Sequence, residues 1–565
     1  MTTWYLGLST SGHDPALAIV NEAGQVVYAE ATERFLQDKR AWGIAPDHAP
    51  HLERALKACG ASPETDRFCV GTSWKAMKAQ MDVNVHDAML PALDTLWMRG
   101  LHATQQAMAG HSLLRLGVAP ERQHLLRHEH HLCHAVTAAW FAPVSDALVL
   151  VLDGEGDAGA VSAYAMQDRR IKRLWRSWGP GSLGTFYGWL TFRCGFDWRL
   201  GEEWKVMGLA AFGKVLPDLQ GALERLLTVR DGRLVFPAVE VIAGIQHMAA
   251  AHAREPHEPL MQAADLAASG QAAYSALADA VILDLIRQQD GQGPFDLLLS
   301  GGCALNSSYN GSAAARLGLR AIHVPPCPAD DGNAIGAALL SWMQDQERHT
   351  LPASPDGAPF LGREAETGGC DLRSHLNGFQ VEDVTGRSAA AVAGALAQGR
   401  TVGTFRGRAE FGPRALGNRS ILADPARAGM KDHVNAAIKG REAYRPFAPA
   451  VREHDAASWF TGPQSSPYMS MTLPWRQVRM GLVPAVVHAD GTGRAQTVTQ
   501  QMYPWMSELL DGMERHTGQA VLLNTSFNIM GKPMVDTLED ALAVLCTTGL
   551  DAVLAGDLLI SKPDR

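Results

Sequence analysis

Short apolar runs alternate with polar turns in the same order in two stretches of the chain. Residues 5–8 and 16–20 are apolar and flank a polar turn at 9–14, and a third run at 25–30 follows a turn at 21–24. This spacing predicts three antiparallel strands. About 145 positions later the pattern returns, with apolar runs at 147–152 and 160–164 around a Gly/Asp turn at 153–157. The repeat predicts a duplicated core.

A further apolar strand, predicted at 295–299, leads into Ser300, Gly301 and Gly302 and then into a helix-compatible stretch from 304 to about 318. A buried strand followed by glycines and a helix start is suited to a nucleotide. Two polar hairpins and such a glycine pair are typical of the actin, sugar-kinase and heat-shock ATPases. We therefore predict an α/β fold of this duplicated class for the N-terminal part.

The length and a change of pattern predict two domains. A chain of 565 residues is too long for one hydrophobic core. Between about 344 and 378, prolines, glycines and charges replace any periodicity, which is typical of a linker. The predicted division is a domain at 1–345, a linker at 346–378 and a second domain at 379–565, with strands at 401–405 and 521–523.

Composition narrows the class of protein. The formal net charge of −9 argues against a general nucleic-acid or membrane-surface binder. No run approaches the roughly 18 apolar residues that a membrane span needs. The eight cysteines are scattered and form no CxxC pair, which favours reduced thiols. We expect a cytoplasmic protein that binds neither nucleic acid nor membrane.

One basic segment stands out in this acidic chain. Residues 406–445 hold nine Lys or Arg against four Asp or Glu. Glycines and Pro413 favour a loop there, and Phe405, Phe411 and Leu416 would half-bury the cations. Several guanidinium groups together favour a phosphate-containing ligand, which they bind in two-pronged fashion. The alternative is an exposed, ion-paired surface.

Two histidines lie four positions apart, a spacing that could let both bind one metal ion. His130 and His134 project from one face if the segment is helical, and could bind one divalent ion. Carboxylates after predicted strands, at 153, 157, 330 and 331, could complete the site. Such a donor set suits Fe²⁺ or a similar ion. A solvated helix face is the competing interpretation.

Seven strings, in order, resemble the antibiotic and nodulation-factor O-carbamoyltransferases from end to end. They are GHD at 12–14, HHLCHA at 130–135, KVMGLA at 205–210, GGCALN at 301–306, GPRALGNRS at 412–420, RPFAP at 445–449 and NTSFN at 524–528. The resemblance implies an N-terminal domain similar to the tRNA threonylcarbamoyladenosine transferase. It implies a C-terminal α/β domain similar to threonylcarbamoyl-adenylate synthase.

The resemblance also implies a reaction in two steps. Carbamoyl phosphate is broken down in the C-terminal domain, and ATP, with Mg²⁺, converts the carbamate to carbamoyl adenylate. The N-terminal metal site then passes the carbamoyl group to a hydroxyl of a small natural product or sugar, as in antibiotic biosynthesis and other secondary metabolism.

Residue roles follow from the same resemblance. The residues implied to bind carbamoyl phosphate and the ATP phosphates are Arg414, Arg419, Lys439, Arg445, Arg494, Ser526 and Asn528. Those implied to contact the nucleotide are Lys205, Gly301, Gly302 and Asn306. The implied metal ligands are His130, His134, Asp153 and Asp330, with Asp330 favoured over Asp331. His13 is implied to orient or deprotonate the acceptor hydroxyl, and the implied catalytic group also includes Arg414, Arg419 and Lys439.

Two alternative functions are also consistent with the sequence. A sugar-kinase-like phosphotransferase would use the N-terminal fold alone, and a tRNA threonylcarbamoyl-type enzyme would need a nucleic-acid partner. The sequence leaves the acceptor alcohol, the native metal and the oligomeric state undecided. Segments 78–105 and 230–264 are expected to shape the acceptor pocket.

Overall fold

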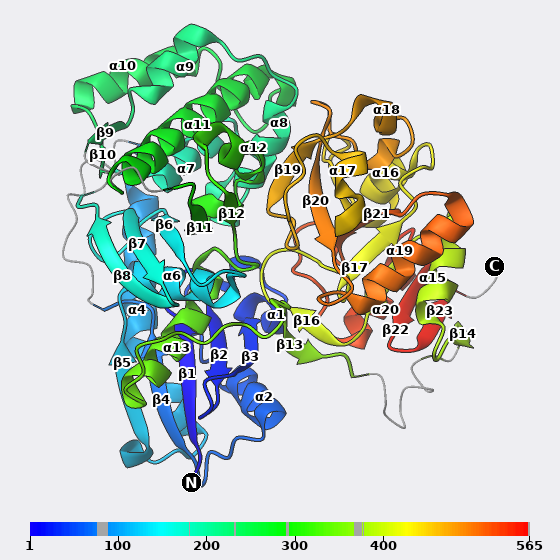
Figure 1. Ribbon diagram of the computed structural model, residues 1–565, viewed down its shortest axis with the longest axis horizontal. Helices are drawn as coiled ribbons and strands as arrows, with labels where there is room; N and C mark the ends of the chain where they lie inside the picture. Colours follow the sequence, from blue (N-terminus) through cyan, green and yellow to red (C-terminus); the bar gives the residue numbers. More distant parts are fainter. Residues whose placement is uncertain are drawn as a thin grey trace. The chain divides into compact units, whose positions relative to one another are not determined.

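A computed structural model describes residues 1–75, 89–179, 181–230, 233–289, 293–366, 376 and 378–562. The chain forms two compact units, shown in Figure 1. Unit 1 comprises Met1–Thr32 and Arg40–Ser354, and unit 2 comprises Glu33–Lys39 and Pro355–Arg565. Each unit is described by itself below.

Unit 1 contains two five-stranded sheets of the same topology. The first has the order β3-β2-β1-β4-β5, and the second, read in the same sense, β8-β7-β6-β11-β12. In both, the first three strands are antiparallel neighbours and the last two are parallel to the central one. The fold is therefore α/β and duplicated, as in the actin and sugar-kinase ATPases, and the predicted repeat is confirmed.

The strand bounds agree closely with the apolar runs. The first sheet consists of β1 (Thr3–Ser9), β2 (Ala16–Val20), β3 (Val26–Ala31), β4 (Arg67–Thr72) and β5 (Gln123–Arg127). The second consists of β6 (Ala147–Leu152), β7 (Val161–Gln167), β8 (Arg170–Arg176), β11 (Asp296–Ser300) and β12 (Ala321–His323). A separate pair joins β9 (Thr228–Arg230) and β10 (Arg233–Val235).

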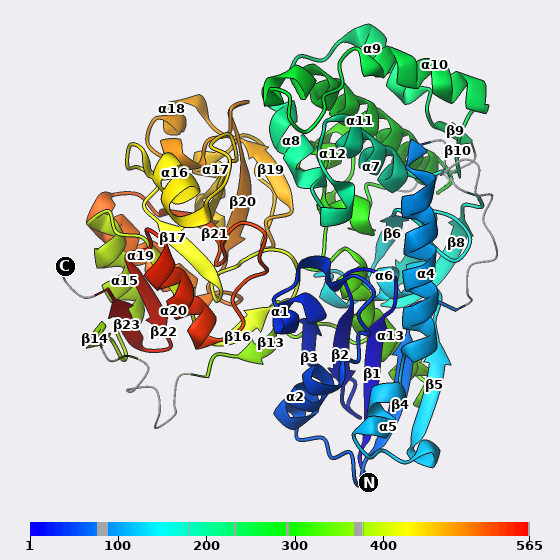
Figure 2. The ribbon, with the colours of Figure 1, turned by 180° about the vertical axis from the view of Figure 1, so that it is seen from behind.

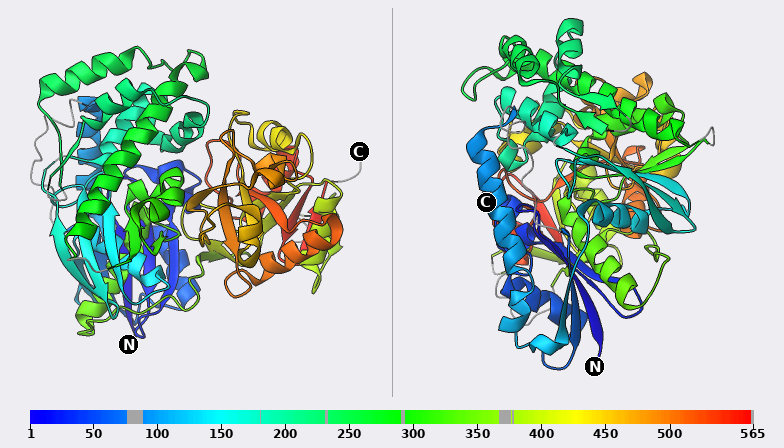
Figure 3. Two further views of the ribbon diagram at one scale, coloured as in Figure 1. Left: turned by 45° about the horizontal axis from the view of Figure 1, so that its top comes forward. Right: turned by 90° about the vertical axis from the view of Figure 1, so that its left-hand side faces the viewer.

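Helices cover these sheets and connect them. They include α2 (Ala49–Cys59), α4 (Ala92–Met108), α5 (His111–Arg115), α6 (His130–Phe141) and α13 (Asn333–Asp345). Between β8 and β11 lie α7 (Leu183–Arg193), α8 (Glu203–Ala210), α9 (Pro217–Glu224), α10 (Val239–Ala250) and α11 (Ala264–Arg287), and α12 (Ser307–Leu317) follows β11. Figure 3 shows α7 to α11 gathered as a helical layer of unit 1.

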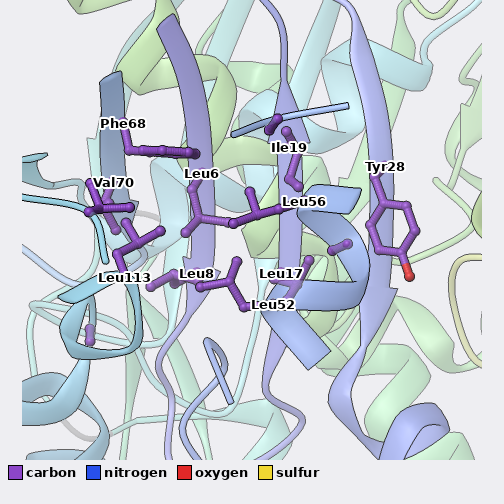
Figure 4. Packing of buried hydrophobic residues seen from close by; sticks show 14 residues of the cluster. Leu6, Leu8, Leu17, Ile19, Tyr28, Leu52, Leu56, Phe68, Val70 and Leu113 are labelled. Carbon is purple, nitrogen blue, oxygen red and sulfur yellow. The ribbon is translucent and has the colours of Figure 1, made fainter. Parts of the chain in front are cut away.

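The packing of unit 1 explains why its central strands β1, β2, β6 and β11 are almost wholly apolar. One face of the first sheet packs Leu6, Leu8 and Leu17 against Leu52 and Leu56 of α2, as Figure 4 shows. The other face is covered by α13, which also packs on α6, and α6 lies against the second sheet. Strands buried on both faces show continuous hydrophobic runs instead of alternation.

Unit 2 is built on a nine-stranded sheet in the order β14-β23-β22-β15-β17-β21-β18-β20-β19. Its strands are β14 (Gln380–Asp383), β15 (Val402–Phe405), β17 (Ser420–Ala423), β18 (Ala448–Arg452), β19 (Met471–Pro474), β20 (Thr492–Val498), β21 (Val521–Ser526), β22 (Ala552–Ala555) and β23 (Leu558–Ser561). The helices include α15 (Ser388–Ala397), α16 (Met430–His433), α17 (Ala456–Trp459), α18 (Gln477–Met480), α19 (Pro504–Thr517) and α20 (Leu538–Thr547).

The predicted linker contains ordered structure. Within it, β13 (Phe360–Glu364) pairs antiparallel with β16 (Arg408–Glu410), and unit 2 already includes residues from Pro355 onward. Part of the predicted linker lies outside the described residues. Segment Glu33–Lys39, which contains most of α1 (Thr32–Leu36), also belongs to unit 2 although it lies early in the chain. The sequence pattern did not predict this insertion.

Within the residues that the structure describes, one helix is long and apolar enough to cross a bilayer by length and composition alone. It spans Leu260–Arg287, and 61% of its apolar window is buried inside the structure. Its buried face packs against α7, α8 and α9. A mostly buried apolar helix of this kind is common in protein cores, so it is weak evidence for a membrane span.

Candidate active sites

The first site lies where α6 begins. The helix starts at His130, so His130 and His134 fall on successive turns and both side chains are buried. Asp153 follows directly after β6, and Asp330 starts the short turn before α13. The structure thus brings together the four residues predicted to hold a metal, from three separate segments.

These four side chains have the geometry of a metal site. One ligand atom from each lies within 4.8 Å of the others. His134 Nε2 is 3.1 Å from Asp153 Oδ2 and 3.3 Å from Asp330 Oδ1. This nitrogen is buried and has no hydrogen-bond partner in the part of the chain that the structure describes. A buried imidazole nitrogen that faces two carboxylates without hydrogen-bond geometry to either fits a divalent cation.

Electrostatics support the same interpretation. Burial disfavours a charged imidazole, but the carboxylates of Asp330 and Asp153 outweigh it and raise the pKa of His130 to about 10. Asp331 is not part of the cluster, and its Oδ1 accepts the backbone N–H of Gly332 at 2.9 Å. Of the two adjacent aspartates, the geometry therefore favours Asp330 as the ligand.

The glycine pair sets the orientation of Asp153. Gly301 has φ of 90°, and a Cβ there would lie 2.2 Å from the carbonyl oxygen of Leu152. Only glycine allows this close approach. The N–H of Gly302 donates to Asp153 Oδ1 at 3.0 Å, which leaves Oδ2 facing the two histidines. The pair was predicted to contact a nucleotide; in this structure Gly302 orients Asp153, one of the predicted metal ligands.

His13 lies beside the metal-ligand cluster. Its Nε2 is 3.7 Å from Asp330 Oδ2, and its Nδ1 is 2.9 Å from Asp14 Oδ2. Asp14 has a positive φ of 47°, a strained conformation that is more frequent at functional sites. Burial acts against ionisation of Asp14, but the charge of Arg40 and the hydrogen bond from His13 lower its pKa to about 2. Asp14 therefore stays ionised and positions both neighbours.

The other predicted nucleotide-binding side chains already have protein partners. Lys205, on α8, forms an ion pair with Glu202 Oε1 at 2.5 Å. Asn306 caps α12 by accepting the N–H of Tyr309 at 3.1 Å, and its amide pairs with that of Gln271. Their nucleotide contacts stay predictions.

The second site lies in unit 2, around the segment 407–420. A buried carboxylate organises this loop: Glu410 Oε1 accepts the backbone N–H groups of Leu416, Asn418 and Arg419 at 2.7, 2.8 and 3.2 Å. Segment 33–39 also contributes, because Arg34 donates to the carbonyl oxygen of Gly412 at 2.9 Å. The loop is therefore fixed before any ligand binds.

Arg419 and Arg414 lie in the same loop but differ in burial and in hydrogen bonding. Arg419 is fully buried, stacks on Phe405 at 4.2 Å and donates to the carbonyl oxygens of residues 363, 406, 407 and 418. Its hydrogen bonds give it a structural role. Among the residues that the structure describes, none accepts a hydrogen bond from Arg414, and burial lowers the pKa of Arg414 to about 10. Arg414 is thus the arginine available to a ligand.

Three other predicted residues meet at one point. Lys439 ends a π-helical turn, Val434–Lys439, a rare conformation that is frequent at functional sites. Its Nζ lies 3.2 Å from Ser526 Oγ and also contacts Asn528 Oδ1, and these two side chains hydrogen-bond each other at 2.7 Å. Burial and the charges of Arg441, Arg445 and Lys39 lower the pKa of Lys439 well below its usual value.

Several cations of unit 2 interact unfavourably. Burial, and then the charges of Arg414, Arg441 and Arg445, lower the pKa of Arg494 well below its usual value. Arg441 lies in the basic segment 406–445 but is not among the predicted binding residues. Segment 33–39 supplies Lys39, which no local pattern indicated. Buried cations that repel one another favour binding of a multiply charged anion.

Comparisons with known proteins agree with this two-part arrangement. The family description "Carbamoyltransferase N-terminus" matches residues 4–339, and "Carbamoyltransferase C-terminus" matches residues 393–562. Nodulation protein NolNO of Sinorhizobium fredii is 33% identical over 98% of this chain and 80% of its own length. The 3'-hydroxymethylcephem-O-carbamoyltransferase of Amycolatopsis lactamdurans is 33% identical over 76% of this chain and 79% of its own length.

One solved structure shows only a weak likeness to this chain. Full-length HypF in a phosphate- and nucleotide-bound form has 13% identity and a TM-score of 0.32, over 61% of this chain and 56% of its own length. The assignment rests on the sequence matches, which cover both units. The chain belongs to the carbamoyltransferase family.

Proposed function

We propose that this carbamoyltransferase is ATP-dependent and acts on a hydroxyl group. In unit 2, water converts carbamoyl phosphate to carbamate and phosphate, and the carbamate oxygen attacks the α-phosphate of ATP to give carbamoyl adenylate and pyrophosphate. At the site in unit 1, an acceptor oxygen attacks the carbamoyl carbon and AMP leaves. The acceptor proton is released, so the products are an O-carbamate and AMP.

The cation cluster of unit 2 supports the first step. Arg414, Arg494, Arg441 and Lys439 would bind the phosphates of two anionic substrates and stabilise charge that develops during transfer. Arg445, Ser526 and Asn528 would complete the binding surface. Arg419 would act indirectly by holding the loop that carries Arg414.

The cluster in unit 1 supports the second step. His130, His134, Asp153 and Asp330 would hold a divalent ion, with Fe²⁺ favoured by the two-imidazole, two-carboxylate donor set. When bound, such an ion polarises carbonyl or phosphate oxygens of the adenylate. His13 would orient the acceptor hydroxyl and take up its proton at Nε2.

One observation carries the proposal: each unit has its own cluster of side chains suited to one step. Unit 2 has a cluster of cations, and unit 1 has a set of potential metal ligands. The experiment incubates the protein with carbamoyl phosphate, ATP, Mg²⁺, Fe²⁺ and a panel of alcohols. We expect pyrophosphate release and an acceptor mass increased by one carbamoyl group. A folded protein that consumes neither carbamoyl phosphate nor ATP with any acceptor would refute the proposal.

Separate variants test whether unit 2 forms the adenylate and unit 1 transfers the carbamoyl group. Arg494→Gln is expected to abolish pyrophosphate release while an added divalent ion still binds. His130→Ala is expected to lose the ion and transfer but to retain adenylate formation. Equal loss of both activities in both variants would contradict two separable sites. An acceptor that gained phosphate would instead support a phosphotransferase, and tight, salt-sensitive tRNA binding would support a tRNA-modifying enzyme.

A further inference from the structure

A surface groove of unit 1 shares no residue with either candidate active site. It has a volume of about 480 Å³, and its lining includes Arg170, Trp342, Glu347, Arg348, His349 and Leu351. Pockets of this size that combine a few polar groups with apolar walls hold small organic molecules. We propose that this groove binds a small organic phosphate monoester, a dianion with an apolar body. The inference does not depend on the proposed function.

The charged side chains of the groove favour an anion. Arg170 and Arg348 line it, and within the described residues neither guanidinium forms an ion pair with a carboxylate. Glu347 is the acidic residue of the lining, so the two arginines leave a formal net charge of +1 before His349 is counted. Guanidinium groups bind phosphate oxygens in two-pronged fashion, so a phosphate dianion matches this arrangement.

A further cation lies behind the groove. Arg169 donates to the carbonyl oxygens of Ala139 at 2.6 Å and of Val144 at 3.1 Å. It also donates to the carbonyl oxygen of Pro352, a lining residue, at 3.3 Å. Burial lowers the pKa of Arg169, and no carboxylate among the described residues pairs with it. A partly buried cation without a counter-ion gains stability from an anion bound nearby.

The apolar part of the groove is fixed before any ligand binds. It is formed by Trp342 and Leu351, which are both largely buried. The indole N–H of Trp342 donates to the carbonyl oxygen of Glu22 at 3.0 Å, and the backbone N–H of Leu351 donates to the carbonyl oxygen of Arg169 at 3.0 Å. A preformed site loses little entropy on binding. Apolar walls beside basic side chains suit an organic phosphate better than inorganic phosphate.

The groove lies at the other end of the two helices that begin at the metal-ligand cluster. These helices, α6 and α13, pack against each other, and Figure 2 shows both within unit 1. The helix α6 begins at His130, and a carbonyl oxygen of its last turn accepts from Arg169. The helix α13 begins just after Asp330 and ends two residues before Glu347. At 1.5 Å per residue, α6 is about 18 Å long. The groove is therefore a separate site of unit 1.

NMR on the full chain with ¹³C-labelled histidine rings tests the inference. The signal of His349 is identified by its loss in His349→Gln. The cation cluster of unit 2 contributes no lining residue to this groove, so the signal reports on the groove alone. The probe is phenyl phosphate, with benzoate, phenol and inorganic phosphate as comparison compounds. We expect phenyl phosphate to shift the signal saturably, and each comparison compound to bind at least about fivefold more weakly.

Variants of the lining should change the affinity in opposite directions. Arg348→Gln and Arg170→Gln are each expected to weaken phenyl phosphate binding about tenfold. Glu347→Gln removes a carboxylate from the same groove and should strengthen binding about twofold. Arg287→Gln is the matched control, because Arg287 is an exposed arginine at the end of α11 that does not line the groove. Its binding should match the wild type.

Three results would overturn the inference. They are the absence of a saturable shift of the His349 signal, equal or tighter binding of any comparison compound, and unchanged phenyl phosphate binding in both Arg348→Gln and Arg170→Gln.

Discussion

Arg414 offers a test in which function and stability should change in opposite directions. A fall in the pKa of Arg414 from its ordinary value to about 10 corresponds to about 3 kcal/mol of cost to its charged form in the folded protein. Part of the side chain reaches solvent, so we expect Arg414→Gln to increase the free energy of unfolding by about 1–2 kcal/mol. For a unit of this size that raises the melting temperature by about 2–8 °C.

The pH dependence of this effect has a defined sign. Below pH 10 Arg414 is protonated in both the folded and the unfolded chain, so its full cost is present at pH 7.5. The cost declines only as the pH rises from about 10 toward the ordinary pKa of arginine, because the folded form loses its proton first. The variant should therefore be more stable than the wild type throughout the neutral range.

Arg419→Gln is the matched control in the same loop. Arg419→Gln removes a buried cation whose N–H groups donate hydrogen bonds to four carbonyl oxygens. We therefore expect the free energy of unfolding to fall by about 3–5 kcal/mol. Two neighbouring Arg→Gln changes should thus shift stability in opposite directions.

Thermal denaturation with and without carbamoyl phosphate measures both effects. A ligand at a hundred times its Kd stabilises the wild type by about 2.7 kcal/mol. Arg414→Gln should lose that increase while melting at a higher temperature in its absence. If Arg414→Gln melted lower than the wild type, or kept the full ligand-induced increase, the reasoning that Arg414 is held for a ligand at a cost to stability would be refuted.

Three further predictions concern unit 1. Calorimetry should show that Asp330→Asn weakens binding of an added divalent ion at least tenfold, whereas Asp331→Asn stays within about twofold; equal losses would contradict the ligand assignment. His13→Asn should slow carbamoyl transfer by about 10²–10⁴ with pyrophosphate release unchanged in the same assay, and a parallel loss of both would argue for a structural role. Affinity for the ion should rise about tenfold per pH unit for each proton released, because His130, with a pKa of about 10, must lose its proton to bind; a flat profile between pH 6 and 9 would exclude this coupling.

The strands could be predicted because burial on both faces leaves long apolar runs. Residues 147–152 were predicted as a strand and form β6. The i, i+4 spacing of His130 and His134 puts both on one face if the segment is helical, and the segment does form a helix that starts at His130. Such features depend on local sequence, so the sequence contains enough information to predict them.

Other features depend on contacts between distant residues. Arg414 and Arg419 have the same chemistry and lie five positions apart, yet only the fold shows which guanidinium faces backbone carbonyls. The association of segment 33–39 with unit 2 joins residues more than 370 positions apart, as Arg34 and Gly412 illustrate. Trp42 and Trp97, whose ring centroids lie 4.7 Å apart, join a loop to a helix in the same way. No periodicity in the sequence reports these pairs.

The insertion of segment 33–39 affects how the two units can be produced and recombined. The chain passes between the units three times, after Thr32, Lys39 and Ser354. A fragment beginning at residue 355 would lack the partner of Gly412 and the Gln37 side chain that donates to the carbonyl oxygen of Met534. During synthesis that segment leaves the ribosome hundreds of residues before the rest of unit 2. Domain exchange between relatives would therefore have to carry two separate pieces of chain.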